Sequence, residues 1–198
     1  MIANSARCHG ADGSGRGSAA FPKIAGQRRE YLFNALRAFA HDQRHSGIMQ
    51  PVAAGLSAAE MRQLADHYGG LATSPRPEEA SAARPPTDGT ARALRGGASS
   101  IARGREIAAR GIPGQRVPSC ADCHGPAPRR RNPAYPRLAG QYADYLVLQL
   151  ELFKQDQRGG SRYAHLMRKV APRLSTQQMR DVAAYYASLP AHAEPAVD

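Results

Sequence analysis

Cys120-Ala121-Asp122-Cys123-His124-Gly125 contains a Cys-x-x-Cys-His motif. Two thiols at this spacing can each add to a vinyl group of one porphyrin, and the adjacent imidazole then lies beneath the iron as an axial ligand. A Cys-x-x-Cys pair alone also occurs in dithiol redox couples and in half of a zinc site. Neither of these requires the trailing histidine. The motif therefore favours haem c, attached through Cys120 and Cys123, with His124 as the proximal ligand.

An altered copy of this pattern lies near the start of the chain. Ser5-Ala6-Arg7-Cys8-His9-Gly10 aligns with the motif, and the segment 21–27 (Phe-Pro-Lys-Ile-Ala-Gly-Gln) aligns with 135–141 (Tyr-Pro-Arg-Leu-Ala-Gly-Gln). Further matches follow in the same order: Tyr31 with Tyr145, Arg44 with Arg158, Met49 with Met167, Met61 with Met179, and Tyr68 with Tyr186. So many ordered matches indicate a tandem duplication.

Each copy has the apolar spacing of α-helices. Apolar residues recur at three- and four-residue intervals over 30–40 and 144–153, and an amphipathic segment over 101–109 precedes the second motif. Ser57 and Ser175 resemble N-caps of helices that continue to Leu71 and Leu189. We therefore predict an all-α fold made of two tandem small helical domains related by internal duplication.

The composition of the chain suggests where these domains begin and end. Residues 74–98 contain four prolines among Ser, Ala and charged residues, which is typical of a linker. We expect a first domain at 1–73, a second at 99–190, and a frayed tail at 191–198.

Methionine is the candidate for the second axial ligand, because a soft thioether favours ferrous iron. Met61 and Met179 have core spacing within helices, where a flexible apolar side chain fills space. Met49 and Met167 precede those helices in proline-containing segments that we expect to be irregular. Loops commonly carry functional groups, so Met49 and Met167 are the preferred ligands. His165 is the one other histidine near enough in sequence to serve as a substitute.

Pro22 and Pro136 follow His9 and His124 at similar intervals, each in a Pro-x-Ile/Leu-Ala-Gly segment. A carbonyl there could accept the imidazole N–H and so fix the tautomer of the ligand. A plain turn is the alternative for either proline alone. Recurrence in both copies favours the ligand-orienting interpretation.

The formal net charge of the 198-residue chain is +11, and arginine dominates it. Such an excess suits an acidic protein partner, a membrane surface or nucleic acid. The arginines are scattered except for the run at 129–131, which favours a solvated face, and no nucleic-acid-binding motif is present. No stretch approaches the ~18 apolar residues of a membrane span.

These motifs resemble those of class I c-type cytochromes, and two such units in tandem resemble the dihaem cytochrome c4 group. The resemblance covers nearly all of the chain outside the linker and tail. It implies a periplasmic electron carrier, not an enzyme, with two haems. In that family, Met49 and Met167 would be the distal ligands and Pro22 and Pro136 the acceptors on the proximal side.

The sequence departs from the family pattern in two ways. Ser5 stands where the first attachment cysteine belongs, and because serine cannot form a thioether, only Cys8 could attach haem in the first copy. The first copy also lacks the amphipathic segment ahead of its motif. Since haem is attached outside the bacterial cytoplasm, we expect an export signal and one helix to lie upstream of Met1.

The partners that the resemblance implies are a quinol-oxidising cytochrome complex or a dehydrogenase on one side and a terminal oxidase on the other. The net positive charge agrees with acidic redox proteins as partners. It also agrees with peripheral association with a membrane. Two alternatives stay open: a cytochrome subunit of a dehydrogenase or oxidase complex, and a zinc site or nucleic-acid binder using Cys8, His9, Cys120, Cys123 and His124.

Overall fold

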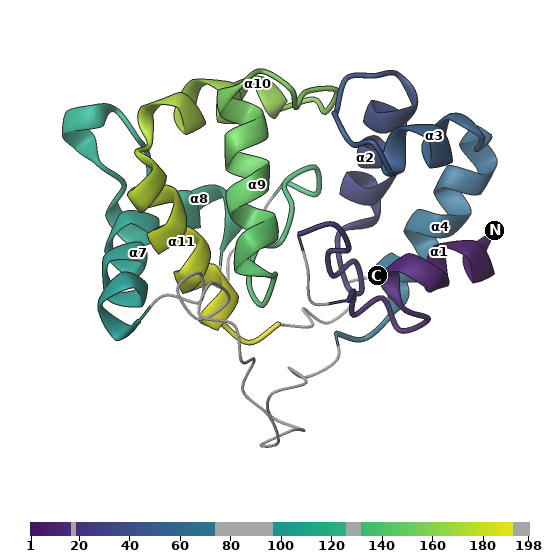
Figure 1. The fold of residues 1–198 in the computed structure, drawn as a ribbon, viewed down its shortest axis with the longest axis horizontal. Helices are drawn as coiled ribbons and strands as arrows, with labels where there is room; N and C mark the ends of the chain where they lie inside the picture. Colours follow the sequence, from purple (N-terminus) through teal and green to yellow (C-terminus); the bar gives the residue numbers. More distant parts are fainter. Residues whose placement is uncertain (17–18, 74–96, 126–131, 192–198) are drawn as a thin grey trace.

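The computed structural model describes residues 1–16, 19–73, 97–125 and 132–191, and in these ranges it is all-α (Figure 1). Most of the expected linker, most of the expected tail and the arginine run at 129–131 lie outside the described residues. The α-helices are α1 (Ile2–His9), α2 (Arg29–Ala40), α3 (Met49–Ala54), α4 (Ala58–Gly70), α7 (Ala98–Arg110), α8 (Cys120–His124), α9 (Ala143–Lys154), α10 (Ala164–Val170) and α11 (Thr176–Ser188). Two short 3-10 helices are η1 (Pro113–Gln115) and η2 (Ala171–Arg173). None of the helices in the described ranges is long and apolar enough to span a bilayer.

The helices form two groups, α1–α4 and α7–α11, that lie side by side (Figure 1). In the first group, Leu32 of α2 packs on Leu64, Ala65 and Tyr68 of α4. In the second, Leu146 of α9 packs on α11, which also packs along α7. The equivalent helices of the two copies thus form two similar cores, as a duplicated sequence requires.

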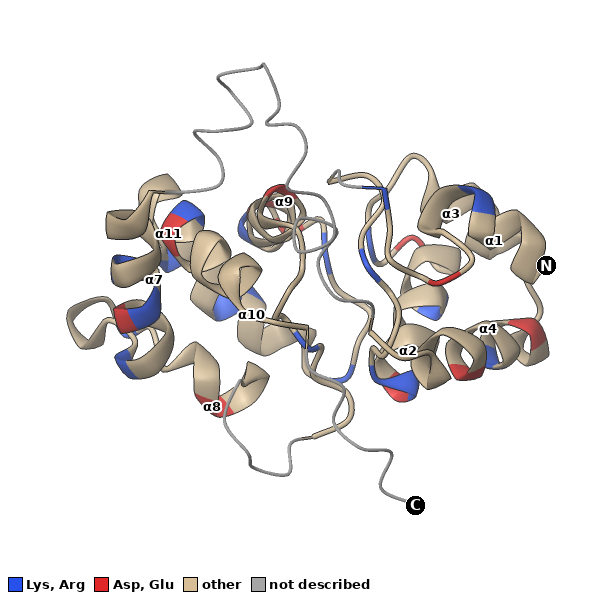
Figure 2. Ribbon diagram, turned by 90° about the horizontal axis from the view of Figure 1, so that it is seen from below, with Lys and Arg blue, Asp and Glu red and all other residues tan. Residues whose placement is uncertain are grey.

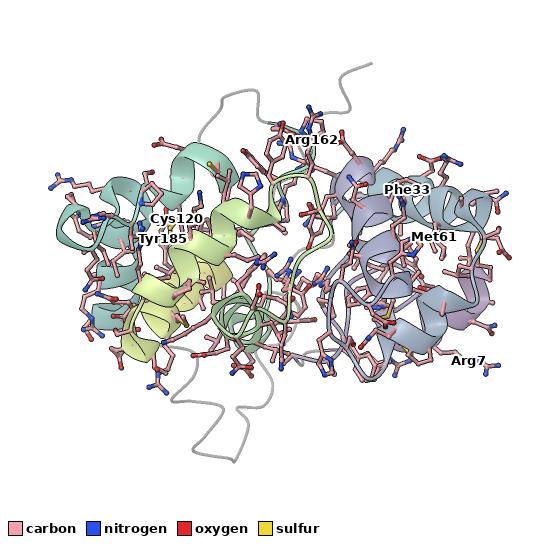
Figure 3. The ribbon with its side chains drawn as sticks, turned by 90° about the horizontal axis from the view of Figure 1, so that it is seen from above. Arg7, Phe33, Met61, Cys120, Arg162 and Tyr185 are labelled. Atoms are coloured by element: carbon pink, nitrogen blue, oxygen red, sulfur yellow. The ribbon has the colours of Figure 1, made fainter. Side chains whose placement is uncertain are left out.

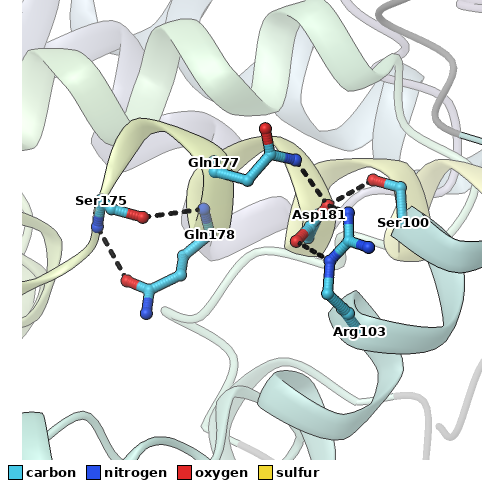
Figure 4. A network of polar contacts seen from close by, with 6 residues as sticks. All are labelled: Ser100, Arg103, Ser175, Gln177, Gln178 and Asp181. Carbon is cyan, nitrogen blue, oxygen red and sulfur yellow. Dashed lines mark hydrogen bonds and ion pairs between the residues drawn. The ribbon is translucent and has the colours of Figure 1, made fainter.

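Both predicted serine caps are confirmed. The Ser57 hydroxyl accepts a hydrogen bond from Glu60 N, and the Glu60 carboxylate accepts one from Ser57 N at 2.8 Å. Ser175 and Gln178 form the same reciprocal pair at the start of α11 (Figure 4). These capping boxes satisfy N–H groups that the first turn of a helix leaves without partners.

The prediction that Met49 and Met167 lie in irregular segments is wrong. Met49 is the first residue of α3, and Met167 lies within α10, which leads into η2. The prolines allow this because Pro51 is the third residue of α3 and Pro172 the second of η2. The N–H groups in a first turn have no intrahelical acceptor, so a proline there removes no hydrogen bond.

The contact between the two groups is nearly symmetric. Gln27 Nε2 donates to Arg137 O at 3.0 Å and Arg137 N to Gln27 Oε1 at 2.8 Å, while the equivalent Gln141 makes the same pair of bonds with Lys23. Arg44 and Arg158 pair in an isolated antiparallel bridge. Lys and Arg accordingly appear on the loops that face one another between the groups in Figure 2.

The prediction of a solvated arginine face is wrong at this contact. Arg137 also donates to Gly26 O at 2.7 Å across the junction. Arg44 and Arg158 are buried, with exposed fractions of 5% and 8%. These three cationic side chains hold the two groups of helices together instead of facing solvent.

Candidate functional site

One continuous cavity of about 1070 Å³ runs between the two groups of helices. It exceeds the roughly 300–1,000 Å³ typical of small-molecule pockets. Its walls are largely apolar and include Leu36, Phe39, Leu146, Phe153 and Leu174. It therefore has the size and the lining for a large apolar ligand.

The two motif histidines line this cavity in equivalent settings. His124 ends α8 and its Nδ1 lies 2.9 Å from Pro136 O; His9 ends α1 and its Nδ1 lies 3.0 Å from Pro22 O. Both expected histidine–proline contacts are thus present. Because a carbonyl only accepts, Nδ1 carries the proton in each ring, and Nε2 is then the nitrogen whose lone pair can bind a metal.

Burial keeps the His9 imidazole neutral. It lowers the pKa of His9 by more than the hydrogen bond to Pro22 O raises it. A neutral ring with a protonated Nδ1 is the form that binds iron through Nε2.

The structure separates the four recurring methionines into two pairs. Met49 and Met167 line the same cavity as His9 and His124. Met61 and Met179 are buried within α4 and α11, with exposed fractions of 5% and 0%. Met61 is labelled within the first group of helices in Figure 3. The geometry therefore favours Met49 and Met167 as axial ligands, whereas the substitute candidate His165 is exposed on α10.

Of the three predicted attachment cysteines, Cys120 and Cys123 line the cavity and Cys8 does not. Cys120 and Cys123 line the cavity from α8, and Cys120 and Tyr185, both labelled in Figure 3, each pack against the core of the second group of helices. Ser119 caps α8 by accepting from Asp122 N, and its hydroxyl donates to Ala108 O at 3.1 Å, which anchors the motif on α7. Cys8 is half-buried on α1, between Ser5 and His9, which both line the cavity.

The state of these thiols bears on the zinc alternative. Burial raises the pKa of Cys120 to about 11, so zinc binding there would have to displace a proton from the thiol. Within the part of the chain that the structure describes, no three His, Cys, Asp or Glu side chains gather as a metal-binding group. The described cysteines and histidines thus fit thioether attachment and axial ligation better than a zinc cluster.

Sequence reasoning missed a buried polar cluster where the two groups meet. Arg44, Arg158, Tyr31, Tyr145 and Gln149 all line the cavity. Arg44 Nε is buried without a hydrogen-bond acceptor. A largely apolar cavity lined by two imidazoles, two thioethers and an unsatisfied guanidinium N–H fits a haem, which has an apolar ring and acidic edges. Recurrence of the Tyr and Arg positions in both copies was the signal that could have identified this cluster.

Comparison with known proteins agrees with this geometry. The family model for cytochrome c matches residues 101–190. The protein named "Thiosulfate dehydrogenase electron acceptor" of Thiomonas intermedia is 35% identical over 92% of this chain and 77% of its own length. Cytochrome c4 of Thiocapsa roseopersicina is 32% identical over 92% of this chain and 85% of its own.

A solved structure extends the similarity to the whole fold. Cytochrome c4 of Acidithiobacillus ferrooxidans has a TM-score of 0.73 and 29% identity, and the match covers 94% of this chain and 99% of that one. The matches to these relatives and to this solved cytochrome c4 structure cover both copies of the duplicated sequence. The chain is therefore a member of the dihaem cytochrome c4 family of class I c-type cytochromes, which are electron carriers.

Proposed function

We propose that this cytochrome carries two c-type haems and transfers single electrons between proteins of the bacterial periplasm. The observation that carries the proposal is the recurrence, in one cavity, of a histidine bonded to a proline carbonyl and a methionine from a short helix: His9 with Met49, and His124 with Met167. The haem-binding units would be residues 1–73 and 99–190.

The residues of each unit would hold the cofactor differently. Cys120 and Cys123 would attach one haem by two thioethers, and Cys8 the other by a single thioether because of Ser5. Haem held in this way supplies reversible ferric–ferrous chemistry. Pro22 and Pro136 would orient the histidines, and the apolar walls would exclude water from the iron.

A cationic rim defines where a partner would approach. Four exposed basic side chains line the cavity in the second copy: Arg110, Arg116, Lys169 and Arg173. At Lys169 and Arg173 the first copy has Pro51 and Gly55, which are uncharged. Because opposite charges steer encounter, an acidic redox protein would dock at this rim, in a complex that weakens with salt.

A dehydrogenase is the donor we favour, with a terminal oxidase as acceptor. The support is the 35% identity to a protein whose printed name makes it the electron acceptor of thiosulfate dehydrogenase. The second candidate, a quinol-oxidising cytochrome complex as donor, follows from the wider family. In the third candidate function, the chain is a permanent subunit of a dehydrogenase or oxidase complex. This candidate predicts that the chain co-purifies with a catalytic subunit.

The test mixes the ferric matured protein with thiosulfate and a thiosulfate dehydrogenase and follows haem reduction by stopped-flow absorbance. Rapid reduction that requires the dehydrogenase, slows with salt and slows in the Lys169→Glu/Arg173→Glu variant supports the proposal. Arg105→Glu/Arg180→Glu, a double change at exposed positions on α7 and α11 that do not line the cavity, is the matched control. No reduction by the dehydrogenase, together with rapid reduction by a quinol-oxidising complex, would reject it in favour of the second candidate.

A further inference from the structure

Two aspartates occupy the same place in both copies, in a backbone conformation that favours glycine. Asp42 follows the C-cap of α2 with φ 55°, and Asp156 follows the C-cap of α9 with φ 58°. In the described part of the chain, they are two of three non-glycine residues with left-handed backbone. A carboxylate beside the negative end of a helix dipole is also unfavourable. Because aspartate is used twice where glycine would fit without strain, the carboxylate itself has a role.

In the first copy, the Asp42 carboxylate is bonded to the start of the helix that carries Met49. Asp42 Oδ1 accepts a hydrogen bond from Gln50 Nε2 at 2.6 Å, and Gln50 directly follows Met49. The Gln50 Oε1 accepts from Ser46 N at 2.8 Å, and Ser46 Oγ accepts from Met49 N at 3.1 Å. The side chain of Gln50 thus connects the first turn of α3 to the end of α2.

In the second copy, an ion pair makes the same connection. Asp156 Oδ1 pairs with Arg168 Nε, and Arg168 directly follows Met167. The N-cap of α10, Tyr163, makes no side-chain hydrogen bond to its helix. A link between an aspartate and the residue after a methionine therefore recurs, although its donor changes from an amide to a guanidinium.

These two links fix the methionines relative to the walls of the cavity. Met49 and Met167 are half-buried. The core anchors their segments one helical turn later, at Ala53 and Ala171, which both have an exposed fraction of 0%. The aspartates end α2 and α9, the helices that supply apolar side chains to the cavity. Each link therefore restrains a thioether with respect to the helix that lines its own half of the cavity.

We propose that Asp42 and Asp156 are positioning residues, whose carboxylates hold Met49 and Met167 on iron against competing ligands. This rests on the proposed function, because it requires iron bound by these methionines. None of the four linked side chains, those of Asp42, Gln50, Asp156 and Arg168, lines the cavity. Each aspartate therefore acts through the methionine and not by contact with the haem.

The experiment measures how fast imidazole displaces methionine in the ferric matured holoprotein at constant pH. In this exchange an iron–sulfur bond breaks and an iron–nitrogen bond forms, with no change of oxidation state. The weak band that a sulfur ligand gives ferric haem at the red end of the visible spectrum reports the loss of methionine. The variants are Asp42→Gly and Asp156→Gly, with Asp42→Asn and Asp156→Asn as conservative changes.

Glycine separates a positioning role from a merely structural one. It removes the carboxylate and also relieves the left-handed backbone, so the unfolding temperature of the holoprotein should change little. Asp66→Asn is the control for loss of an exposed carboxylate, because Asp66 pairs with Arg29 at 3.9 Å on the surface of the first half. It should leave exchange at both centres as in the wild type. The half that a variant leaves intact is an internal control.

Each Gly variant should speed imidazole exchange at one of the two centres by about two- to fivefold, the range expected for loss of an exposed pair. The other centre should keep the wild-type rate. The Asn variants should give a smaller increase, because the amide oxygen still accepts a hydrogen bond but carries no charge.

Gly variants that exchange imidazole at the wild-type rate overturn the proposal. An equal change at both centres also overturns it, because that result indicates a general loosening of the fold. If a Gly variant fails to mature, the Asn variant at the same position decides by the same criterion. A wild-type protein without the sulfur-to-iron band overturns the proposed ligation as well, which distinguishes that failure from a failure of the aspartates alone.

Discussion

Met167 is the residue whose chemistry would set the redox behaviour of the second half as an axial ligand. Its thioether would stabilise ferrous iron, whereas an imidazole stabilises ferric iron. Met167→His should therefore lower the midpoint potential of that centre by on the order of 0.1–0.3 V, within the ~0.8 V range that axial ligands cover. Potentiometric titration followed in the visible spectrum measures this shift.

Met179→Leu provides the matched control, because Met179 lies in a core with Val117 and Leu174. It should leave the potential unchanged. Equal shifts in both variants, or no shift in Met167→His, would show that Met167 is not an axial ligand.

Ser5 is the residue that makes the two copies chemically different. It lies one helical turn before Cys8 on α1, and side chains three apart share a helix face. Ser5→Cys should add a second thioether to the first haem and increase the proportion of chains matured with two haems. The pyridine haemochrome band should move to shorter wavelength as the remaining vinyl group is saturated.

Cys8→Ser is the opposite change and should leave the first haem extractable by acidified acetone. If Ser5→Cys protein matured under reducing conditions has the haemochrome spectrum of the wild type, Ser5 does not stand at an attachment position.

The packing of α7 on α11 depends on a buried acid. Asp181, only 2% exposed, accepts hydrogen bonds from Ser100, from Arg103 Nε at 2.7 Å and from Gln177 Nε2 at 2.9 Å (Figure 4). Burial raises the pKa of Asp181, but these hydrogen bonds outweigh it and hold the pKa below its ordinary value. Asp181→Asn should cost about 1.5–3 kcal/mol of unfolding free energy at pH 7, because it replaces charge-assisted bonds.

The hydrogen bonds to Asp181 also decide how the stability of the fold changes with pH. A depressed pKa in the folded state gives stability that is complete above about pH 4 and is lost as the pH falls through the folded pKa. The difference in unfolding temperature between wild type and Asp181→Asn should thus shrink below about pH 4. Asp66→Asn, at an exposed surface pair on α4, should change little at any pH. A difference independent of pH would contradict this account.

Gly104 permits α7 and α11 to approach closely. A Cβ at this position would lie 1.9 Å from the carbonyl oxygen of Asp181, a backbone atom that cannot move alone. Gly104→Ala should push the helices apart and destabilise the fold by about 1–3 kcal/mol or more. Thermal unfolding of the holoprotein measures this.

Gly114→Ala is the control for Gly104→Ala, because a Cβ on Gly114 meets nothing within 4 Å. A Gly104→Ala protein as stable as this control would mean that the helices are not in the contact described.

Local signals in the sequence were sufficient to predict the helix caps but not the short helices α3 and α10. Ser57 and Ser175 could be identified as caps because the partner lies three residues on, within the same turn. The helices α3 and α10 were missed because proline was taken to exclude a helix, whereas Pro51 lies in a first turn. Positional context within the helix, and not residue type alone, decides such cases.

At the scale of the whole molecule, the all-α fold and the cytochrome c4 family were predictable because duplication repeats most of the helix and motif signals. The histidine–proline pairing followed from the same recurrence. The choice of Met49 and Met167 did not, because Met61 and Met179 recur as well; it rested on an expectation of irregular segments, which α3 and α10 contradict, and it stays a prediction. The contact of Arg44 with Tyr145 was not predictable, since it joins residues far apart in sequence and depends on how two folded cores dock. Scattered arginines look alike in sequence whether they face solvent or a junction.

The central claim is that both copies of this duplicated chain bind haem covalently. The most direct measurement is a pyridine haemochrome spectrum combined with intact and peptide mass on protein matured in a bacterial periplasm. We predict two haems per chain, one attached to Cys120 and Cys123 and one to Cys8 alone. A colourless protein, or a peptide containing residues 120–124 without attached haem, would contradict the account.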